Sequence, residues 1–271
     1  HSHGHTPSQS VSSQDTEAES SWALGHADFM TNDSVAVTSD GTLLAFVEQH
    51  NNKKSLILKK AYGDTQNLIY TASDEGHSLS SPAFSPTGNA IAFVIKENEN
   101  CTLFEVEFDA TSLVEDQKHK LTNIGVCKKA PQVAYVDTNN ILYLAQSTTP
   151  PYFNVMRFNT TTNSTFAAVA NAQLEQTTTA GNYWFSYNED TQSMAFLRDI
   201  NGKTAVFRYN FIDEQLTQII TVNGKVTALD WLTTEQLLVM QNRHLKIIDI
   251  NKQDIKPTNF AQVKSLLNDQ S

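Results

Sequence analysis

The stretch Ser-Pro-Ala-Phe-Ser-Pro-Thr-Gly-Asn-Ala-Ile-Ala-Phe-Val, at Ser81–Val94, decides the fold because weaker copies of it recur along the chain. Each copy consists of a short apolar strand, a turn and a second apolar strand. Asp40-Gly41 and Thr87-Gly88 supply the positive φ that tight hairpin turns need. Asn, which also tolerates that backbone geometry, is abundant. The weaker copies are Val35–Val47, Val133–Leu144, Trp184–Leu197 and Ala228–Gln241.

The copies recur at a regular period. One large residue marks the matching position in each, and successive spacings are 47, 50, 53 and 44 residues. Four short strands in about 45–50 residues is the spacing of one β-propeller blade. We therefore predict an all-β chain, a β-propeller of four-stranded antiparallel blades with about five blades recognisable. A β-sandwich is the alternative, but it does not predict one recurring motif. The matching residues are Phe46, Phe93, Tyr143, Phe196 and Met240.

Further strands follow each hairpin and complete the predicted blades. Several of them alternate apolar and polar residues, which suits half-buried strands. Third strands are expected at Ser55–Lys60, Thr102–Phe108, Phe153–Phe158, Ala205–Tyr209 and Leu245–Ile250. Fourth strands are expected at Gln66–Thr71, Lys118–Thr122, Thr165–Val169 and Leu216–Thr221. Helical periodicity occurs only at Ala261–Leu267.

Composition and charge limit the partners. The 271 residues include 39% hydrophobic residues, enough to bury a core, and the net charge is −10. Because phosphate contacts need Lys and Arg, an acidic chain without a basic cluster is a poor nucleic-acid binder. No run approaches the ~20 apolar residues of a membrane span. Residues 1–21 are polar, Ser-rich and acidic, so we predict a flexible linker there and a propeller domain at 22–271 that can be incomplete at its C-terminal end.

The chain has two cysteines, Cys101 and Cys127. Two thiols cannot form a four-thiolate zinc site, and no Cys-x-x-Cys pair occurs. The residues leave two interpretations open, which are two unrelated buried thiols or one disulfide. No cofactor is predicted.

The segment Ser81–Val94 resembles the signature strand pair of TolB-like β-propellers. Blades of that family show a Pro, an aromatic residue, Ser-Pro-Asp-Gly and then an apolar-Ala-Phe strand. Here Thr87 replaces the Asp, and the pattern is specific only at residues 38–47 and 81–94. As architecture, the resemblance covers about residues 30–250. Family propellers often have more than five blades, and the ring can close with an N-terminal strand near Trp22–Met30.

A narrower similarity concerns the cysteines. Their placement is similar to that in the extracytoplasmic propellers of membrane-anchored winged-helix regulators, the ToxR/CadC-like group. This resemblance implies a periplasmic sensor domain that binds an unknown protein or small-molecule signal, while a separate DNA-binding domain lies beyond the membrane. Within that similarity we predict a Cys101–Cys127 disulfide that ties blade two to blade three. An oxidising periplasm permits such a bond. A free periplasmic TolB-like scaffold for protein partners is the alternative.

Motifs for chemistry are missing from the sequence. It has no Gly-x-Ser-x-Gly nucleophile elbow, no phosphate loop and no His-Glu-x-x-His motif. We therefore predict no catalytic residues and no enzyme. A propeller-type hydrolase or lyase with an active site in the funnel is the alternative from another class. His1 and His3 can bind Cu(II) or Ni(II) in a square plane if His1 is a free native N-terminus.

Recognition is expected on the loop face of the propeller. Loops between second and third strands share one face with loops between blades. Tyr152, Tyr183 and Arg198 fall in those loops and have the chemistry favoured at binding hot spots. We predict that they contact the signal or partner.

Overall fold

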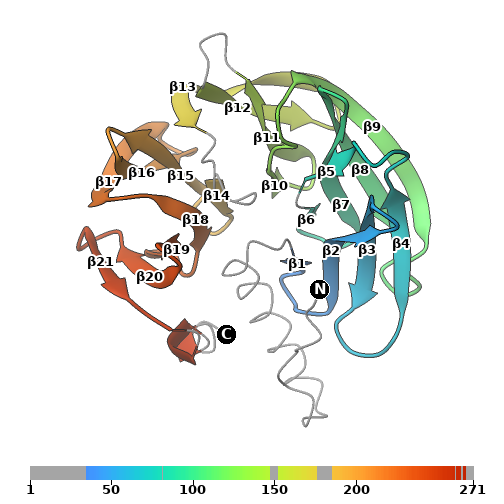
Figure 1. The fold of residues 1–271 in the computed structure, drawn as a ribbon, viewed down its shortest axis with the longest axis horizontal. Helices are drawn as coiled ribbons and strands as arrows, with labels where there is room; N and C mark the ends of the chain where they lie inside the picture. Colours follow the sequence, from blue (N-terminus) through green and yellow to red (C-terminus); the bar gives the residue numbers. More distant parts are fainter. Residues whose placement is uncertain are drawn as a thin grey trace.

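The computed structural model describes residues 35–80, 82–146, 152–175, 185–259, 261–263 and 265–266. In these residues the chain forms five antiparallel sheets arranged as a β-propeller (Figure 1). The predicted fold class is therefore confirmed. The predicted linker, residues 1–21, lies outside the described residues.

Each repeat of the sequence forms one blade, and the strands follow one another from the middle of the ring outwards. Blade one contains β1 (Val35–Val37), β2 (Leu43–His50), β3 (Lys53–Lys60) and β4 (Gln66–Thr71). Blade two contains β5 (Ser78–Leu79), β6 (Ala83–Phe84), β7 (Ala90–Glu97), β8 (Asn100–Phe108) and β9 (Glu115–Val126). Blade three contains β10 (Val133–Asp137), β11 (Asn140–Gln146), β12 (Tyr152–Asn159) and β13 (Ser164–Glu175).

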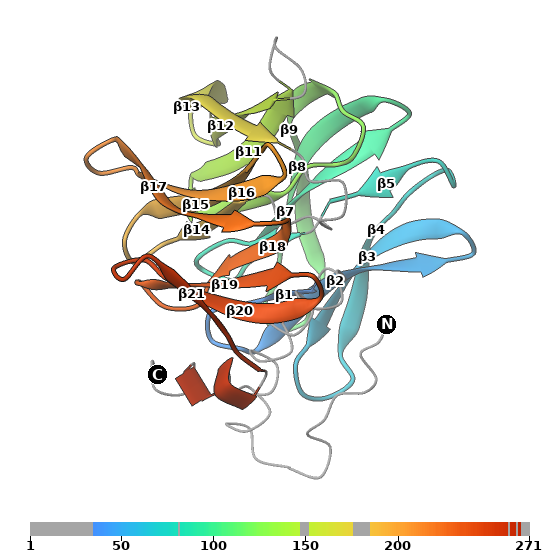
Figure 2. The same cartoon turned by 60° about the vertical axis from the view of Figure 1, so that its left-hand side comes forward.

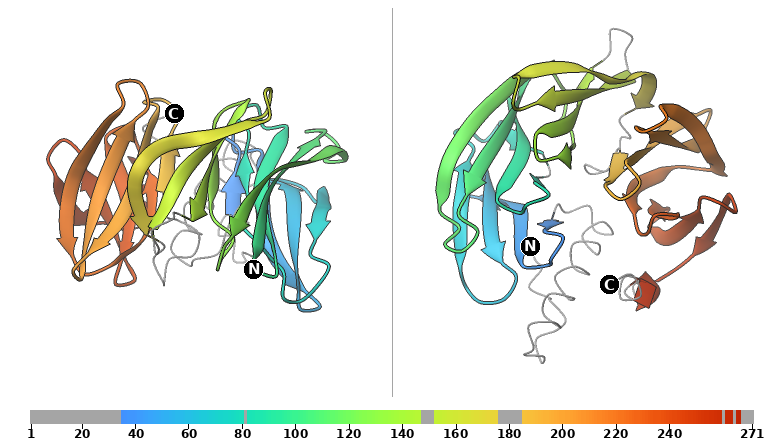
Figure 3. Two further views of the ribbon diagram at one scale, coloured as in Figure 1. Left: turned by 90° about the horizontal axis from the view of Figure 1, so that it is seen from above. Right: turned by 180° about the vertical axis from the view of Figure 1, so that it is seen from behind.

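The last two blades repeat this order. Blade four contains β14 (Phe185–Asn188), β15 (Ser193–Ile200), β16 (Lys203–Asn210) and β17 (Gln215–Asn223). Blade five contains β18 (Val226–Trp231), β19 (Gln236–Gln241), β20 (His244–Asp249) and β21 (Asp254–Pro257). Turning the molecule shows the strands of each blade side by side (Figure 2). From behind, the first strands again lie nearest the middle of the ring (Figure 3).

Blade two has a divided first strand, because β5 and β6 both pair with β7. Pro82, between them, has no N–H to donate to a ladder. Ser80 compensates at the break. Its backbone N–H donates to the Val94 carbonyl at 2.8 Å, and its hydroxyl accepts from the Val94 N–H at 2.8 Å. The divided strand therefore still occupies the inner position of a four-stranded blade.

The repeated large residue occupies the fourth position of the second strand in the first four blades. Phe93, Tyr143 and Phe196 are 0%, 3% and 0% exposed, and each packs on the blade before it. Phe46 is half-buried on the face of blade one that points away from blade two. The predicted equivalence of these four residues is thus confirmed in register, but the prediction that all four are buried was wrong for Phe46.

The match proposed for blade five was wrong by one residue. Val239, not Met240, is the fourth residue of β19 and packs between blades four and five. Because successive side chains of a strand face opposite sides, a shift of one residue moves the side chain to the other face. Met240 instead packs on the outer side of blade five with Leu238, Leu245 and Val263. Val263 belongs to the short helical segment that includes residues 261–263.

In the hairpins between the second and third strands of blades one and five, asparagine takes positive φ without any glycine, so these turns form in a chain with only 10 glycines. Asn51 and Asn52 have φ values of 51° and 65°, and Asn242 and Arg243 have 50° and 64°. Positive φ at both central residues defines the type I′ turn, whose twist matches that of the strands. In the described part of the chain, no helix has the length and hydropathy to cross a membrane.

Candidate binding site at the channel mouth

A cavity of about 220 Å³ lies where the first strands of four blades end. Val37, Thr38 and Ser39 of blade one and Phe84, Ser85 and Pro86 of blade two line it, with Tyr135 of blade three and Glu189 of blade four. In Figure 1 the first strands β1, β6, β10 and β14 lie nearest the middle of the ring, so the cavity that they share lies near the middle too. We call the end of the propeller that holds this cavity the channel mouth.

Two of the lining hydroxyls are held by the turns that carry them. Thr38 Oγ1 accepts from the Leu43 N–H at 3.1 Å, and Ser85 Oγ accepts from the Ala90 N–H at 3.2 Å. The sequences Thr-Ser-Asp-Gly-Thr and Ser-Pro-Thr-Gly-Asn thus form the same turn twice. The two turns lie close together, so a Cβ added at Gly88 would lie 3.6 Å from Thr38 Cγ2.

Asp40 closes the turn of blade one. Its Oδ1 accepts from Thr38 Oγ1 at 2.7 Å, from Thr42 Oγ1 at 2.6 Å and from the Thr42 N–H at 3.0 Å. Partial burial opposes ionisation of this carboxyl, but the hydrogen bonds from Thr42 and Thr38 outweigh it and hold its pKa below the ordinary value. A carboxylate with a lowered pKa is a weak base, so Asp40 is poorly suited to activate the Thr38 hydroxyl as a nucleophile.

A buried polar contact near the cavity joins blades two and three. The Tyr135 hydroxyl donates to Glu105 Oε2 at 2.5 Å, and the two residues are 7% and 9% exposed. Burial raises the pKa of Glu105, the hydrogen bond from Tyr135 opposes that shift, and the charge of Glu107 adds to it. Burial, followed by the Glu105 charge, raises the pKa of Tyr135 well above its usual value. Tyr135 is therefore a neutral donor at physiological pH.

Tyr135 occupies a position that recurs in every blade. In β10 it lies two residues after Val133, which pairs with Tyr143 of β11. In the other four blades the same position of the first strand is occupied by Val37, Phe84, Tyr187 and Trp231. Trp231 Nε1 donates to the Ser186 carbonyl of the preceding blade at 2.9 Å. Burial raises the pKa of Tyr187 to about 12, with Arg157 opposing and Glu189 and Asp137 adding. Four of the five side chains at this position are aromatic, and Val37, Phe84 and Tyr135 line the cavity.

Tyr152 and Arg198, the two described residues among those predicted to bind a partner, do not line this cavity. Arg198 lies inside β15 instead of in a loop, and its guanidinium carbon is 4.4 Å from the ring centroid of Phe207. Tyr152 begins β12 in the neighbouring blade, at the same end of the propeller as Arg198. That end is opposite to the cavity. Tyr183 and the proposed metal ligands His1 and His3 lie outside the described residues.

Sequence reasoning did not identify the lining residues of the cavity. The repeats contained the available signal, since Thr38 and Ser85 occupy the same place in two copies of the motif. The contribution of Glu189 depends on how blade four is placed around the axis, which a single sequence does not state. Among the described residues, no group of three or more His, Cys, Asp or Glu side chains could hold a metal ion.

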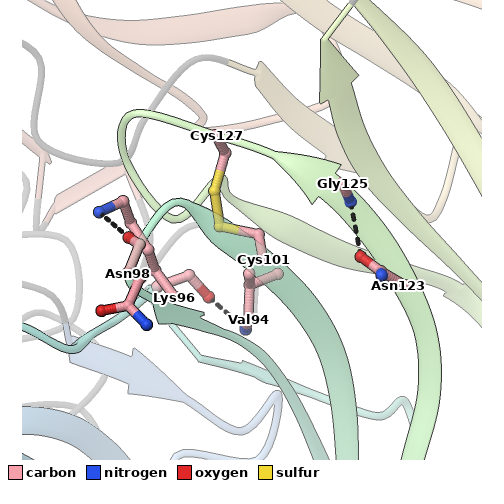
Figure 4. The surroundings of a disulfide bond; sticks show 8 residues. Val94, Lys96, Asn98, Cys101, Asn123, Gly125 and Cys127 are labelled. Atoms are coloured by element: carbon pink, nitrogen blue, oxygen red, sulfur yellow. Dashed lines mark hydrogen bonds between the residues drawn. A yellow bond between two sulfur atoms is a disulfide. The ribbon is translucent and has the colours of Figure 1, made fainter.

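Cys101 and Cys127 are joined by a disulfide, with their Cα atoms 6.0 Å apart (Figure 4). Cys101 lies in β8, and Cys127 follows β9 on the connection to blade three. Both side chains are buried in the apolar cluster between blades two and three. The bond therefore fixes the connection that leads to β10 and Tyr135. A disulfide is consistent with an extracytoplasmic location.

No family model and no curated protein matches the sequence. Solved structures do match the fold. TolB from Acinetobacter baumannii has a TM-score of 0.62 at 14% identity, over 82% of this chain and 52% of TolB. The chain therefore spans about half the length of that protein. The common fold makes this chain a TolB-like β-propeller in architecture.

Two propeller-containing enzymes also match. The puromycin hydrolase S511A mutant complexed with PGG has a TM-score of 0.58 at 11% identity, over 79% of this chain and 34% of the hydrolase. Oligogalacturonate lyase in complex with manganese has a TM-score of 0.57 at 6% identity, over 83% of this chain and 63% of the lyase. At these identities the likeness concerns the fold alone, so function has to be argued from the site.

The buried Glu105 carboxyl makes stability depend on pH. Because its pKa is raised in the folded state, its favourable contribution is complete below the unfolded pKa of about 4.3 and is lost as pH rises through the folded pKa. The free energy of unfolding of the wild type, relative to Glu105→Gln, should therefore fall as pH rises across this range. Urea titrations at a series of pH values measure it.

The matched control for this prediction is Glu115→Gln on β9. Glu115 is exposed, so this substitution removes the same charge without touching a buried carboxyl. Its stability difference from the wild type should change much less with pH. Parallel pH profiles for the wild type and Glu105→Gln would contradict the prediction.

Proposed function

We propose that this chain is a binding propeller without catalytic activity, and that it recognises a partner at the mouth of its central channel. The observation that carries this proposal is the cavity shared by four blades. Its Thr38 and Ser85 hydroxyls hold turns, and its Tyr135 hydroxyl is bonded to Glu105. Side chains engaged in this way favour shape and hydrogen-bond recognition over acyl transfer, which needs a nucleophile next to a base of suitable pKa.

Within this proposal, the chain is the periplasmic sensor domain of a membrane-anchored winged-helix regulator. Three features support that finer reading, namely the TolB-like fold, the Cys101–Cys127 disulfide and the acidic, Ser-rich residues 1–21. Partner binding would bias the state that the linker transmits to the membrane helix. A free periplasmic scaffold shares the binding step but sends no signal. A propeller-type hydrolase or lyase is the second candidate, favoured only by the fold of the enzymes above.

The sensor proposal is tested on the complete gene. The reading frame upstream of His1 should encode a membrane-spanning segment and a winged helix. A cleavable signal sequence in that place would favour the free scaffold instead. A transcriptional reporter driven by the full-length protein then measures the response.

Variants at the two ends of the channel locate the sensing surface in that assay. Ser39→Lys places a large cation in the cavity and should reduce the response without lowering stability, since Ser39 is exposed. The double variant Arg198→Ala, Tyr152→Ala tests the opposite end, where sequence analysis placed recognition. A response lost only in the double variant would move the sensing surface to that end.

A further inference from the structure

The two ends of the channel differ in charge. The turns between first and second strands, 38–42, 85–89, 138–139, 189–192 and 232–235, surround the end that holds the cavity. With the last residue of β10, they contain five carboxylates and no Lys or Arg. All five carboxylate residues are exposed. They are Asp40, Asp137, Glu189, Asp190 and Glu235.

The opposite end is close to balanced. The connections between blades that the structure describes there are 72–77, 127–132 and 224–225. By sequence they carry Lys128, Lys129 and Lys225 against Asp74 and Glu75. Among these turns and connections, the acidic excess is therefore concentrated at the end that has the cavity, and the field there attracts cations.

Few of these carboxylates are neutralised by bases within the molecule. Asp137 Oδ2 lies 3.9 Å from the Arg157 guanidinium. In the part of the chain that the structure describes, no Lys, Arg or His lies within ion-pair distance of Glu189, Asp190 or Glu235. Their charge is available to a partner.

The lining of the cavity fits a long cationic side chain. Phe84 and Pro86 offer apolar wall, while Glu189 and the Ser39 hydroxyl offer oxygen acceptors. Lys and Arg have an apolar stem and a charged head, and aromatic faces attract such heads. Among the described residues no cationic side chain lines the cavity, so an anionic ligand would find no charge partner in them.

We infer that the acidic end of the channel docks a basic segment of a partner polypeptide and takes one Lys or Arg side chain into the cavity beside Glu189. This inference rests on the proposed function and names the chemistry of its partner. A polypeptide is favoured over a small amine because the carboxylates continue beyond the cavity. They reach from Asp40 in blade one to Glu235 in blade five, farther than one small molecule in the cavity.

The experiment measures binding of a labelled Gly/Ser peptide that carries lysines, by fluorescence anisotropy on the purified domain. A matched peptide with glutamates in place of lysines is the probe control. The lysine peptide should bind, and its affinity should fall as salt is raised. The glutamate peptide should not bind.

Glu189→Gln is the decisive variant, and Glu214→Gln is its matched control. Glu214 is exposed in the outer turn of the same blade, so both variants remove one charge from the same sheet. Glu189→Gln should weaken the lysine peptide about fivefold, the loss of one ion pair at the stronger end for exposed pairs. Glu214→Gln should leave the affinity unchanged. Thermal denaturation should show that both variants are folded.

Three outcomes would overturn the inference. Equal weakening by Glu189→Gln and Glu214→Gln would show nonspecific attraction to an acidic protein. Binding of the glutamate peptide would refute charge recognition. If spermidine binds as tightly as the peptide and depends on Glu189 in the same way, the ligand of this site is a small amine and not a polypeptide.

The peptide assay and the reporter assay separate this inference from the proposed function. If the peptide depends on Glu189 but the reporter ignores Ser39→Lys, the docking chemistry stands and the sensor role fails. If the reporter responds to Ser39→Lys but the lysine peptide does not bind, the sensor role stands and the inference fails.

Discussion

Replacing Phe196 by alanine should lower the free energy of unfolding by about 3–5 kcal/mol. The side chain is 0% exposed and lies in the apolar cluster between blades three and four. Its ring stacks on Phe207, with centroids 5.4 Å apart and planes at 13°. Truncation removes the buried area and that stacking, and it leaves a cavity between two rigid sheets that cannot close easily.

Phe166→Ala is the control for Phe196→Ala. Phe166 lies on the outer strand β13 and is 49% exposed, so the same deletion should cost less than about 1 kcal/mol. Urea denaturation followed by circular dichroism compares the two variants. Equal losses would mean that the repeated position does not anchor the contact between blades.

The repeat made the fold readable from the sequence. A large residue at one position of each blade, followed by a fixed turn, sets the register of the second strand. The prediction held for Phe93, Tyr143 and Phe196, and the fourth strand at Gln66–Thr71 was placed at its observed bounds. Local pattern sufficed there because each blade is a meander of neighbouring strands.

The sequence pattern identified the wrong residue in blade five, where tertiary packing decides which residues of the second strand are buried. Blade five has a register shift between Val226 and Ala228, and apolar residues occupy both faces of β19. The short C-terminal helical segment covers the outer face, so Met240 is buried as well as Val239. Alternation then no longer marks one face, and the sequence cannot distinguish the two residues.

The candidate site was harder to read than the fold. Its residues come from four separate repeats, and each contributes one to three side chains. The Tyr135–Glu105 pair joins residues 30 positions apart through the packing of two blades. Glu105 alone in the sequence reads as an exposed strand residue. The pKa of Glu105 is raised because the side chain is buried, and it becomes buried only when the blades assemble into the ring.

Removing the disulfide in the variant Cys101→Ala, Cys127→Ala should lower the free energy of unfolding by about 3.5 kcal/mol. The bond closes a loop with a sequence separation of 26 residues, and the chain-entropy model assigns this value to a loop of that length. Both cysteines are nearly fully buried, at 0% and 4% exposed, so alanine retains part of their packing. Urea denaturation of the oxidised wild type and the variant measures the difference.

Reduction of the wild type provides the matched control. Dithiothreitol should bring the wild type close to the stability of the double variant, and it should leave the variant unchanged. The oxidised wild type, unfolded without reductant, should contain no free thiol in a thiol titration. Two free thiols, or a variant as stable as the oxidised wild type, would contradict a stabilising bond.

The loss should also be local before it is global, because the bond holds the connection between β9 and β10. Freed from Cys101, residues 127–132 would constrain β10 less, and β10 carries the Tyr135 hydroxyl that bonds Glu105. Amide hydrogen exchange should therefore accelerate in β10 and in the end of β9, while β15 and β16 of blade four keep their protection. Uniform acceleration in all blades would show that the disulfide stabilises the whole ring rather than the wall beside the channel mouth.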